Sequence, residues 1–451
     1  MTPRREVSRG AFAGEVAVVV GLGVAGASAA RVLAEEGATV RVTETRAAPA
    51  PAPELAAAGV EVLSGGHRPE HLDAATIVVV SPGVRPGSPV LDWAAQRGLQ
   101  VWGELELGAR LASAPYLAVT GTNGKTTTTG MLAACLRASG MDAIACGNIG
   151  RPFPATAREE HDVLVVEASS FQLATQASFH PQVSVLLNVA SDHLDWHGSA
   201  KAYADAKARI FVNQTGSDVH VGNRDDAAGA AVSRRARCDV RWFGADERGR
   251  DDVRIHGGSL VAGWSDVVLE PASDHSPVLE DAAAAVVAAH AFGIEDEALA
   301  EGLRTYRTEP HRGEVVAEVD GVRFVDNSKA TNPHAAVAAA DEREGIVLIA
   351  GGAAKGVDLS PLGSLVPRLA GVVAIGAAAA TVRAIFEGKR PVREASTIED
   401  ATRSAFEMAS RGGTVLLAPA CASWDMFRDY AERGERFAAA ARAIEREGAR
   451  T

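Results

Sequence analysis

A glycine-rich turn between a strand-like and a helix-like segment constrains this chain more than any other feature. Residues 116–119 are apolar, the turn Thr120-Gly-Thr-Asn-Gly-Lys-Thr126 follows, and an apolar segment that suits a helix comes next. Backbone N–H groups in such a turn cradle phosphates, and the start of a helix adds a field that favours anions. The turn therefore predicts an α/β domain that binds a nucleotide, and ATP is the expected one.

Two side chains of this turn have separate expected roles. Lys125 is expected to pair with the β- and γ-phosphates, and Thr126 to offer its hydroxyl oxygen to Mg²⁺. The usual motif has a glycine five positions before Gly124, where this chain has Val119. The alternative interpretation is an ordinary glycine-rich turn between a strand and a helix.

Composition narrows the class of protein. A length of 451 residues suggests two to four domains, and 47% hydrophobic with 23% charged residues lets each domain bury a core. The formal net charge of −12 argues against non-specific nucleic-acid binding, which depends on basic surface. A nucleotide needs only a few local cations, so this charge does not argue against one.

The cysteines and the apolar runs indicate a cytoplasmic protein. Cys135, Cys146, Cys238 and Cys421 are widely scattered, so neither a zinc site nor a disulfide framework is predicted. The N-terminal arginines are not followed by the apolar core of a signal peptide. No apolar run approaches the roughly 18–20 residues that a membrane span needs.

Strand-like and helix-like segments alternate along the whole chain, which predicts an α/β fold with parallel sheets. We expect a Rossmann-like N-terminal domain (1–113), a central P-loop ATPase domain with a mainly parallel sheet (114–309) and a Rossmann-like C-terminal domain (310–451). Residues 213–275, rich in Asp, Arg and Gly, are expected to form a peripheral, irregular part of the central domain. The predicted strands are residues 16–20, 40–42, 77–80, 116–119, 163–166, 183–188, 346–350, 372–375 and 414–417.

The first predicted strand leads into Gly21-Leu-Gly23-Val-Ala-Gly26, with Glu44 about twenty residues further on. This spacing is typical of a dinucleotide-binding turn. It fits a nicotinamide enzyme or any phosphate-bearing ligand at a helix N-terminus. The alternative is that these glycines only allow close packing of helix and strand.

Polar residues follow several other predicted strands, where ligands bind in open α/β sheets. Glu167 ends one strand and could hold Mg²⁺ opposite Thr126, or be a solvated acid. The next strand is followed by Asp192-His193-Leu-Asp195-Trp-His197. This group suggests metal or phosphate chemistry, and the alternative is a set of polar surface residues without a function. By composition Lys207 is an ordinary helix lysine.

The last third of the chain carries four more polar groups. His311-Arg312 lies at a predicted domain boundary, where an arginine can bind phosphate oxygens in a bidentate manner. Asp326-Asn-Ser-Lys-Ala-Thr-Asn332, Gly351-Gly-Ala-Ala-Lys355-Gly356 and Pro419-Ala-Cys-Ala-Ser423-Trp-Asp425 lie in predicted loops. Lys329 and Lys355 make a plausible seat for a dicarboxylate. A turn, cap or linker role is the alternative for each.

Together these motifs resemble the Mur ligase family over nearly the whole chain. The shared pattern is Thr120-Gly-Thr-Asn-Gly-Lys-Thr126, then Glu167, Asp192-His193, Lys207 and His311-Arg312, in that order. The loops that contain Lys329, Lys355 and Ser423 are similar to those of the members that add glutamate. Within this pattern the shorter turn, without a glycine at Val119, is the usual form.

The resemblance implies roles for individual residues. Lys207 matches a lysine that the family carbamylates, so that it binds Mg²⁺, and His193 matches a ligand of the same second metal. Thr126 and Glu167 match the first metal site. Lys125, Glu167, His193, Lys207 and Arg312 are the predicted catalytic residues. The predicted ATP contacts are Gly121, Thr122, Asn123, Gly124, Lys125, Thr126, Thr127, Asp281, Arg312, Asp326 and Asn327.

The resemblance also assigns the other two substrates. The predicted UDP-sugar contacts are Gly23, Val24, Ala25, Glu44, Thr45, Arg46, Ser81, Gly83 and Asn148. The predicted D-glutamate contacts are Lys329, Thr331, Lys355, Ser423 and Tyr430. The N-terminal turn is then expected to hold UDP rather than NAD.

Three positions depart from the family pattern. An aspartate usually stands directly before Ser-Lys-Ala-Thr-Asn, but here Asn327 does and Asp326 precedes it. A His-Asn pair followed shortly by Asn is usual near residue 280, and Asp281 is the only near match. Tyr430 replaces a phenylalanine. These departures concern the contacts to ribose, adenine and glutamate, respectively.

The resemblance implies an ATP-dependent acid–amino-acid ligase that adds D-glutamate to UDP-N-acetylmuramoyl-L-alanine through an acyl phosphate. This reaction belongs to cytoplasmic peptidoglycan precursor synthesis, and hence to cell shape and division. We expect a monomer without nucleic-acid or membrane partners. The alternatives are another Mur-type ligase, a folylpolyglutamate synthetase-like ligase, a nicotinamide-dependent dehydrogenase and a non-catalytic nucleotide sensor.

Overall fold

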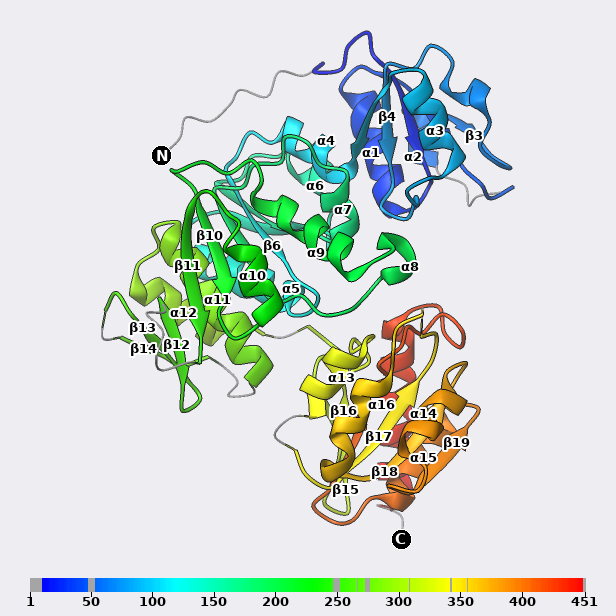
Figure 1. The fold of residues 1–451 in the computed structure, drawn as a ribbon, viewed down its shortest axis with the longest axis vertical. Helices are drawn as coiled ribbons and strands as arrows, with labels where there is room; N and C mark the ends of the chain where they lie inside the picture. Colours follow the sequence, from blue (N-terminus) through cyan, green and yellow to red (C-terminus); the bar gives the residue numbers. More distant parts are fainter. Residues whose placement is uncertain are drawn as a thin grey trace. The chain divides into compact units, whose positions relative to one another are not determined.

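The structure is a computed structural model, and it contains three β-sheets in chain order (Figure 1). It describes residues 10–47, 53–245, 252–265, 267–271, 276–307, 309–340, 343–354 and 356–448. The three sheets are mostly parallel and alternate with helices, which confirms the predicted three-domain α/β class.

The N-terminal sheet has five parallel strands in the order β3-β2-β1-β4-β5. Val18 and Val20 pack with Val78 and Val80 on one face, and Val19 with Val79 on the other, as period-two alternation requires. The elements are β1 (Val16–Val20), α1 (Val24–Glu35), β2 (Thr39–Thr43), α2 (Pro53–Ala57), β3 (Glu61–Leu63), η1 (Pro69–Leu72), β4 (Ile77–Val80), α3 (Pro89–Gln96), β5 (Gln100–Gly103) and α4 (Glu104–Leu111).

The central sheet has nine strands in the order β14-β13-β12-β11-β10-β9-β6-β8-β7. It is parallel from β7 to β12, and two antiparallel pairs at the far edge complete it. The elements are β6 (Tyr116–Thr120), α5 (Lys125–Ala138), β7 (Ala143–Gly147), α6 (Phe153–Thr156), β8 (Val163–Glu167), α7 (Ser170–Ala174), β9 (Val183–Leu186), α9 (Ala200–Ala208), η2 (Arg209–Phe211), β10 (Val219–Asn223), α10 (Ala227–Ser233), β11 (Asp239–Gly244), β12 (Val253–His256), β13 (Ser259–Ala262), β14 (Val268–Leu269), α11 (Ser276–Ala291) and α12 (Asp296–Thr305).

Helices cover both faces of this sheet. Leu117 and Val119 of β6 face a core built with α5, α11 and α12, while Ala118 faces the core that α6, α7 and η2 share. Both faces of β6 are therefore buried, which is why its sequence is apolar throughout.

Residues 213–275 differ from the expectation of an irregular section, because β10 to β14 continue the central sheet through them. β10 pairs with β9 in parallel, and its His220 is fully buried between Ser184 and Ser233, whose hydroxyls bond its two ring nitrogens. The polar residues of this segment concealed the strand pattern. Only β12 to β14 occupy the peripheral edge.

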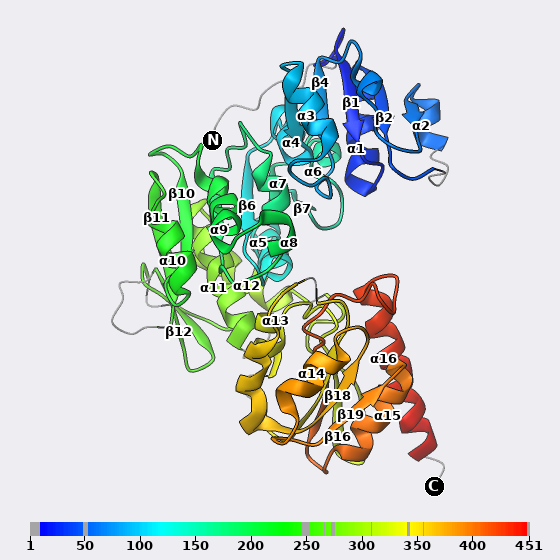
Figure 2. The same cartoon turned by 45° about the vertical axis from the view of Figure 1, so that its right-hand side comes forward.

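The C-terminal sheet has six strands in the order β15-β16-β20-β17-β18-β19 and is parallel except for the β15–β16 pair. α13, η3 and α14 pack on one face, and α15 and α16 on the other (Figure 2). The elements are β15 (Glu314–Val319), β16 (Val322–Asp326), α13 (Pro333–Ala340), β17 (Ile346–Gly351), η3 (Ser360–Arg368), β18 (Leu369–Ile375), α14 (Ala379–Phe386), β19 (Val392–Ala395), α15 (Ile398–Met408), β20 (Thr414–Leu417) and α16 (Tyr430–Gly448).

Two buried glutamates at the start of α4 anchor this helix to the central domain. Glu104 accepts hydrogen bonds from the backbone N–H of Phe153 at 2.9 Å and from Gln172 Nε2 at 2.7 Å. Burial raises the pKa of Glu104 to about 7. Glu106 accepts the backbone N–H groups of Ala177 and Ser178 at 2.8 and 2.7 Å. The N-terminal and central sheets belong to one compact unit.

A second compact unit contains the C-terminal sheet together with Ala190–His197, which includes α8 (Leu194–His197).

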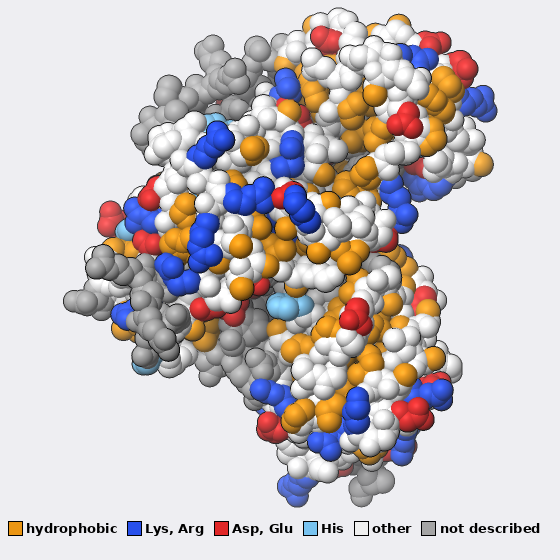
Figure 3. Space-filling view, viewed as in Figure 1, with side chains coloured by type: hydrophobic (Ala, Val, Ile, Leu, Met, Phe, Trp, Pro, Cys, Tyr) orange, Lys and Arg blue, Asp and Glu red, His pale blue; other side chains and the backbone are white. Residues whose placement is uncertain are grey.

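Within the part of the chain that the structure describes, no helix is long and apolar enough to cross a membrane. Lysine and arginine side chains gather over the central domain on the face seen in Figure 3. Exposed arginines of this domain include Arg234, Arg235 and Arg237.

Candidate active site

The phosphate-type turn connects β6 to α5, as the sequence predicts, and Gly124 lies at the turn's tightest point. Its φ of +83° is a left-handed value that favours glycine. A Cβ at this position would also come within 2.0 Å of Asp281 Oδ1. Asp281 in addition accepts a hydrogen bond from Thr128 Oγ1 at 3.2 Å. The structure thus places Asp281 against the turn itself, where it supports the loop.

Asn188, just after β9, holds the turn in shape. Its Oδ1 accepts the backbone N–H groups of Thr122 at 3.0 Å and of Asn123 at 2.9 Å. In the sequence Asn188 is only the last residue of a predicted strand, and its role in the turn was not predicted. An amide at the carboxyl end of a strand next to the phosphate turn was the available signal.

Lys125 folds back over the turn. Its ammonium group donates to the carbonyl oxygens of Gly121 at 3.0 Å and of Thr122 at 2.9 Å. The positive charge therefore lies above the loop, and both contacts are with neutral groups that a phosphate can replace.

Thr126, Glu167 and Asn148 form a chain of polar contacts beside the turn. Thr126 Oγ1 donates to Glu167 Oε2 at 2.8 Å, and Asn148 Nδ2 donates to Glu167 Oε1 at 2.7 Å. Glu167 is buried at the end of β8, which lies next to β6. A hydroxyl and a carboxylate oxygen thus meet at the first turn of α5, the kind of ligands that Mg²⁺ prefers.

Lys207 is not an ordinary helix lysine on the surface, because only 1% of it is exposed. Its Nζ donates to Gly121 O at 2.6 Å and lies 4.6 Å from the centre of the Tyr203 ring. The Tyr203 hydroxyl in turn contacts Thr122 Oγ1 at 3.1 Å. α9 therefore brings a buried cation to the phosphate turn.

His193 lies in the segment that groups with the C-terminal unit. It has a φ of +52°, and its backbone N–H donates to Asp192 Oδ1 at 2.8 Å. Asp192 Oδ2 also receives a hydrogen bond from Asn332 Nδ2 at 3.4 Å. Among the described residues, no three His, Cys, Asp or Glu side chains are grouped so that they could hold a metal ion.

The N-terminal turn has the features of an anion site at a helix start. A Cβ on Gly26 would lie 2.0 Å from Gly21 O, so α1 approaches the end of β1 closely. Ser81 Oγ donates to the same carbonyl at 3.1 Å. Val24, at the start of α1, is 79% exposed, which leaves the helix N-terminus accessible. Gly23 directly precedes α1, Ala25 is in its first turn, and Gly83 follows the end of β4.

Glu44, directly after β2, accepts hydrogen bonds at both of its carboxylate oxygens. Arg46 holds the pKa of Glu44 down at about 2, with help from the backbone N–H groups of Arg46 and Leu22 and from the Thr45 hydroxyl. Arg46 Nη2 lies 3.0 Å from Glu44 Oε2 and 2.8 Å from Leu22 O. The sequence-predicted residues Glu44, Thr45 and Arg46 thus form one cluster beside the N-terminal turn.

Asp326 ends β16 and is fully buried. Its Oδ2 contacts His311 Nδ1 at 2.7 Å, and its Oδ1 accepts the backbone N–H of Ser328 at 2.9 Å. The neighbouring Asn327 donates its backbone N–H to Leu417 O at 2.9 Å, which continues the pairing of β16 with β20. Arg312, next to His311, is half-buried.

The predicted glutamate contacts lie in the loops after β16 and β20 and at the start of α16. Lys329 Nζ lies 3.8 Å from the centre of the Tyr430 ring, a cation–π contact. Thr331 is half-buried in the same loop, and Ser423 is buried beside Trp424, which is 68% exposed. Lys355 lies outside the described residues.

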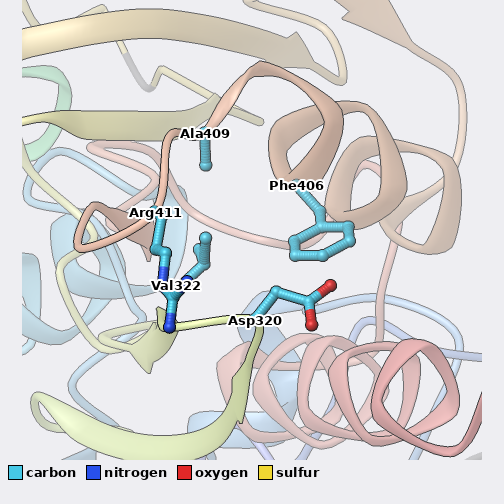
Figure 4. Close-up of a pocket in the computed structure, with 5 residues that line it drawn as sticks. All are labelled: Asp320, Val322, Phe406, Ala409 and Arg411. Carbon is cyan, nitrogen blue, oxygen red and sulfur yellow. The ribbon is translucent and has the colours of Figure 1, made fainter. Parts of the chain in front are cut away.

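A shallow cavity of about 450 Å³ lies at the other end of the C-terminal sheet. It is lined by Asp320, Val322, Phe406, Ala409 and Arg411, none of which the sequence singled out (Figure 4). Val322 begins β16, and Ala409 and Arg411 precede β20. The cavity is therefore at the amino ends of the strands, away from the loops described above.

Comparisons with known proteins agree with this arrangement. Residues 15–103 match the "Mur ligase MurD-like, N-terminal domain", residues 119–262 the "Mur ligase middle domain" and residues 311–421 the "Mur ligase, glutamate ligase domain". The chain is 44% identical to the UDP-N-acetylmuramoylalanine–D-glutamate ligase of Frankia casuarinae, over 96% of this chain and 95% of that one. It is 41% identical to the protein of the same name from Pelotomaculum thermopropionicum, over 94% and 97%.

The chain belongs to the Mur ligase family. This membership confirms the resemblance seen in the motifs, and the chain is an ATP-dependent ligase. Solved Mur ligases share the fold at low identity. UDP-N-acetylmuramate–alanine ligase MurC from Thermotoga maritima superposes with a TM-score of 0.62 at 16% identity, over 95% of this chain and 99% of that one. MurF ligase from Thermotoga maritima in complex with ADP gives 0.58 at 20%, over 84% and 91%.

Proposed function

We propose that this chain joins D-glutamate to UDP-N-acetylmuramoyl-L-alanine at the cost of ATP, as a step of cytoplasmic peptidoglycan precursor synthesis. The observation that carries the proposal is the convergence of Lys125, Thr126, Glu167 and Lys207 on one phosphate turn. The full-length similarity to ligases named for D-glutamate supports the choice of amino acid.

ATP is proposed to bind along residues 121–127, with its phosphates on the N-terminus of α5. Lys125 exchanges its two carbonyl contacts for phosphate oxygens, which neutralises charge during phosphoryl transfer. Arg312 is proposed to add a second cation. Asp326 and Asn327 are proposed near the ribose and Asp281 near the base, although Asp281 also supports the turn.

Mg²⁺ fits the donor set beside the turn. Thr126 Oγ1 and Glu167 Oε2 are proposed to hold one ion, since a hydroxyl and a carboxylate supply the oxygen ligands that this metal needs. The ion would neutralise phosphate charge. Asn148 keeps Glu167 in place through its contact with the other carboxylate oxygen, and we propose that it also reaches the UDP-sugar.

Lys207 is proposed to carry a carbamate, formed when the neutral amine adds to CO₂ and a proton leaves. This modification would replace a buried cation with a pair of oxygen donors next to the turn. With His193, these oxygens would hold a second Mg²⁺. Lysine side chains are rarely buried in proteins. The burial of Lys207 therefore supports a functional role for this residue.

The two other substrates are assigned to the outer domains. UDP-N-acetylmuramoyl-L-alanine is proposed to bind at Gly23, Val24, Ala25, the Glu44–Arg46 cluster, Ser81 and Gly83. D-glutamate is proposed to bind between Lys329, Thr331, Lys355, Ser423 and Tyr430. The two lysine charges would neutralise the two carboxylates of a dicarboxylic amino acid. We propose that the ligase acts as a monomer.

The proposed chemistry has two steps. A carboxylate oxygen of the alanyl group attacks the γ-phosphorus of ATP, and ADP leaves. The amine of D-glutamate then attacks the carbonyl carbon of this acyl phosphate, loses a proton, and the tetrahedral intermediate expels phosphate. Positioning and charge neutralisation supply most of the rate enhancement in such transfers.

A phosphate-release assay tests the proposal. ATP-dependent phosphate release should require both UDP-N-acetylmuramoyl-L-alanine and D-glutamate, and L-glutamate should not replace D-glutamate. Release with L-alanine, a diamino acid or a dipeptide instead would assign the chain to another Mur-type reaction. Release with a folate substrate would assign it to the folylpolyglutamate synthetase type, and no release with any of these pairs would refute the proposed reaction.

A further inference from the structure

Arg433, on the first turn of α16, is a buried cation without an ion pair to any residue that the structure describes. Only 1% of it is exposed. Its Nε donates to Ser328 Oγ at 2.9 Å, its Nη2 to Ser328 O at 2.8 Å and its Nη1 to Cys421 O at 3.1 Å. All three acceptors are neutral. Within the described residues, no carboxylate lies within ion-pair distance of this guanidinium.

Such a residue is expensive for the fold, because burying a charge without a counter-charge costs free energy. Desolvation lowers the pKa of Arg433 to about 10, with Cys421, Asp425 and Asp326 opposing this shift at longer range. The group is therefore still protonated at neutral pH. A neutral side chain of similar size would fill the space without this cost, so the charge and its donors must serve something else.

The contacts of Arg433 join three segments. Ser328 lies in the loop after β16, Cys421 lies in the loop after β20, and Arg433 itself begins α16. Ser328 Oγ closes the arrangement, since it accepts from Arg433 and donates to Tyr430 O at 2.7 Å. The same three segments carry Lys329, Ser423 and Tyr430, the proposed glutamate contacts.

The start of α16 is also fixed from its other side. A Cβ on Gly434 would lie 2.3 Å from His311 Nδ1 and 2.6 Å from Asp326 Oδ2. The helix therefore touches the His311–Asp326 pair directly, and Arg433 cannot withdraw without moving this contact.

We infer that Arg433 is a positioning residue for the amino-acid substrate. It holds the loops after β16 and β20 at a fixed separation, so that Lys329, Ser423 and Tyr430 face one ligand. Its buried charge adds to that of Lys329, which favours a dicarboxylic amino acid over a neutral one. This inference rests on the proposed D-glutamate reaction.

The test compares steady-state constants of the full-length enzyme with those of R433M, R433K and R436M. Arg436 is the matched control, because it lies one turn further along α16, has a side chain that is 42% exposed and forms a bidentate pair with Glu399. R433M should raise KM for D-glutamate about tenfold or more, the range for lost hydrogen bonds of a charged group. KM for ATP and for the UDP-sugar should stay within about twofold.

R433K should recover part of the loss, because one ammonium can replace some of the donors but not all three in their fixed geometry. R436M should match the wild type in all three constants. Thermal unfolding of each variant shows whether it folds. If R433M does not fold, R433K and S328A, which removes the shared hydroxyl, decide the question.

An unchanged KM for D-glutamate in every folded variant of Arg433 and Ser328 would overturn the inference. So would an equal rise of all three KM values, which would mark a purely structural residue. Wild-type enzyme without D-glutamate-dependent phosphate release would refute the proposed function instead, so the two failures are distinguishable.

Discussion

The phosphate turn of the central domain and the loop pair of the C-terminal domain lie at equivalent places but are stabilised differently. Both follow the carboxyl ends of parallel strands, where open α/β sheets bind ligands. The phosphate turn is held by a neutral amide, Asn188, and its Lys125 contacts two carbonyls that a phosphate can replace. The C-terminal loops are held by Arg433, a cation that is itself enclosed.

The difference suits the ligand that we propose for each region. A nucleoside triphosphate brings several negative charges, so the turn needs cations that can move onto it. An amino acid brings a smaller charge, so its recognition depends more on shape. Loops with fixed positions keep the shape of such a binding site. In the central domain the Lys125 charge can move to the ligand. In the C-terminal domain the Arg433 charge holds two loops together.

The largest effect is expected at Lys207 in the central domain. The proposed carbamate would convert its buried ammonium group into an anion. Lys207→Ala should lower kcat by about a thousandfold or more, the scale of lost electrostatic stabilisation. A short-chain carboxylate added to the buffer should restore part of the activity of this variant, by filling the vacated space. Near-normal turnover without any additive would exclude the carbamate.

Asn188→Ala should separate the two regions. It removes the side-chain oxygen that accepts the N–H groups of Thr122 and Asn123, while the backbone carbonyl of Asn188 still accepts the Thr122 N–H at 3.1 Å. KM for ATP should rise about tenfold or more, because the turn loses hydrogen bonds that hold its shape. KM for D-glutamate should not change, the reverse of the pattern expected for R433M. If both variants raise the same constants, the two regions are not independent.

Glu104 sharpens the comparison because it is a buried acid rather than a buried cation. Its folded pKa of about 7 is above the ordinary value of 4.5, so the folded protein binds more protons than the unfolded chain between these values. The free energy of unfolding should therefore decrease as pH rises from 4.5 to 7 and level off above that. The contribution of this group is at most roughly 3 kcal/mol.

Denaturant titrations of wild type and E104Q at pH 5, 6, 7 and 8 measure this dependence. The difference between the two proteins should change with pH in favour of E104Q, whatever its value at pH 5. A constant difference across these pH values would show that Glu104 is not the group responsible.

The smallest effect is expected where a cation is exposed. Arg235 pairs with Asp205 at 2.7 Å on the surface of the central domain, with about half of its side chain exposed. Arg235→Ala should change the free energy of unfolding by less than about 1 kcal/mol, because solvent screens such pairs. It should leave kcat and all three KM values unaltered, and a loss of activity would reveal a function of this surface.

The sequence predicted the strands that are buried on both faces, since a run such as that of β6 admits few other folds. It failed for β10, because His220 and its serine partners look polar although they are buried and mutually satisfied. The motif residues of the turn were likewise predictable from spacing, and the structure brings Thr126, Glu167 and Lys207 to it.

Asn188 and Arg433 were not predictable in the same way. Asn188 supports the turn from a position that reads as the end of a strand. Arg433 stands in a run of charged residues with Glu432, Glu435 and Arg436, and only the fold buries Arg433 and leaves Arg436 partly exposed. The identity of a supporting residue depends on which segments meet, and a linear pattern does not contain this information. The domain boundaries at residues 113 and 309 stay predictions.

The contact of Gly124 and Thr128 with Asp281 has a consequence for how the protein is made. Thr128 and Asp281 are 153 positions apart in the chain. During synthesis the turn and α5 leave the ribosome long before α11 does, at about 5–20 residues per second. Asp281 is therefore synthesised roughly 8 to 30 seconds after the phosphate turn that it supports. A nascent chain that ends before α11 should lack a finished ATP site, however complete its motif.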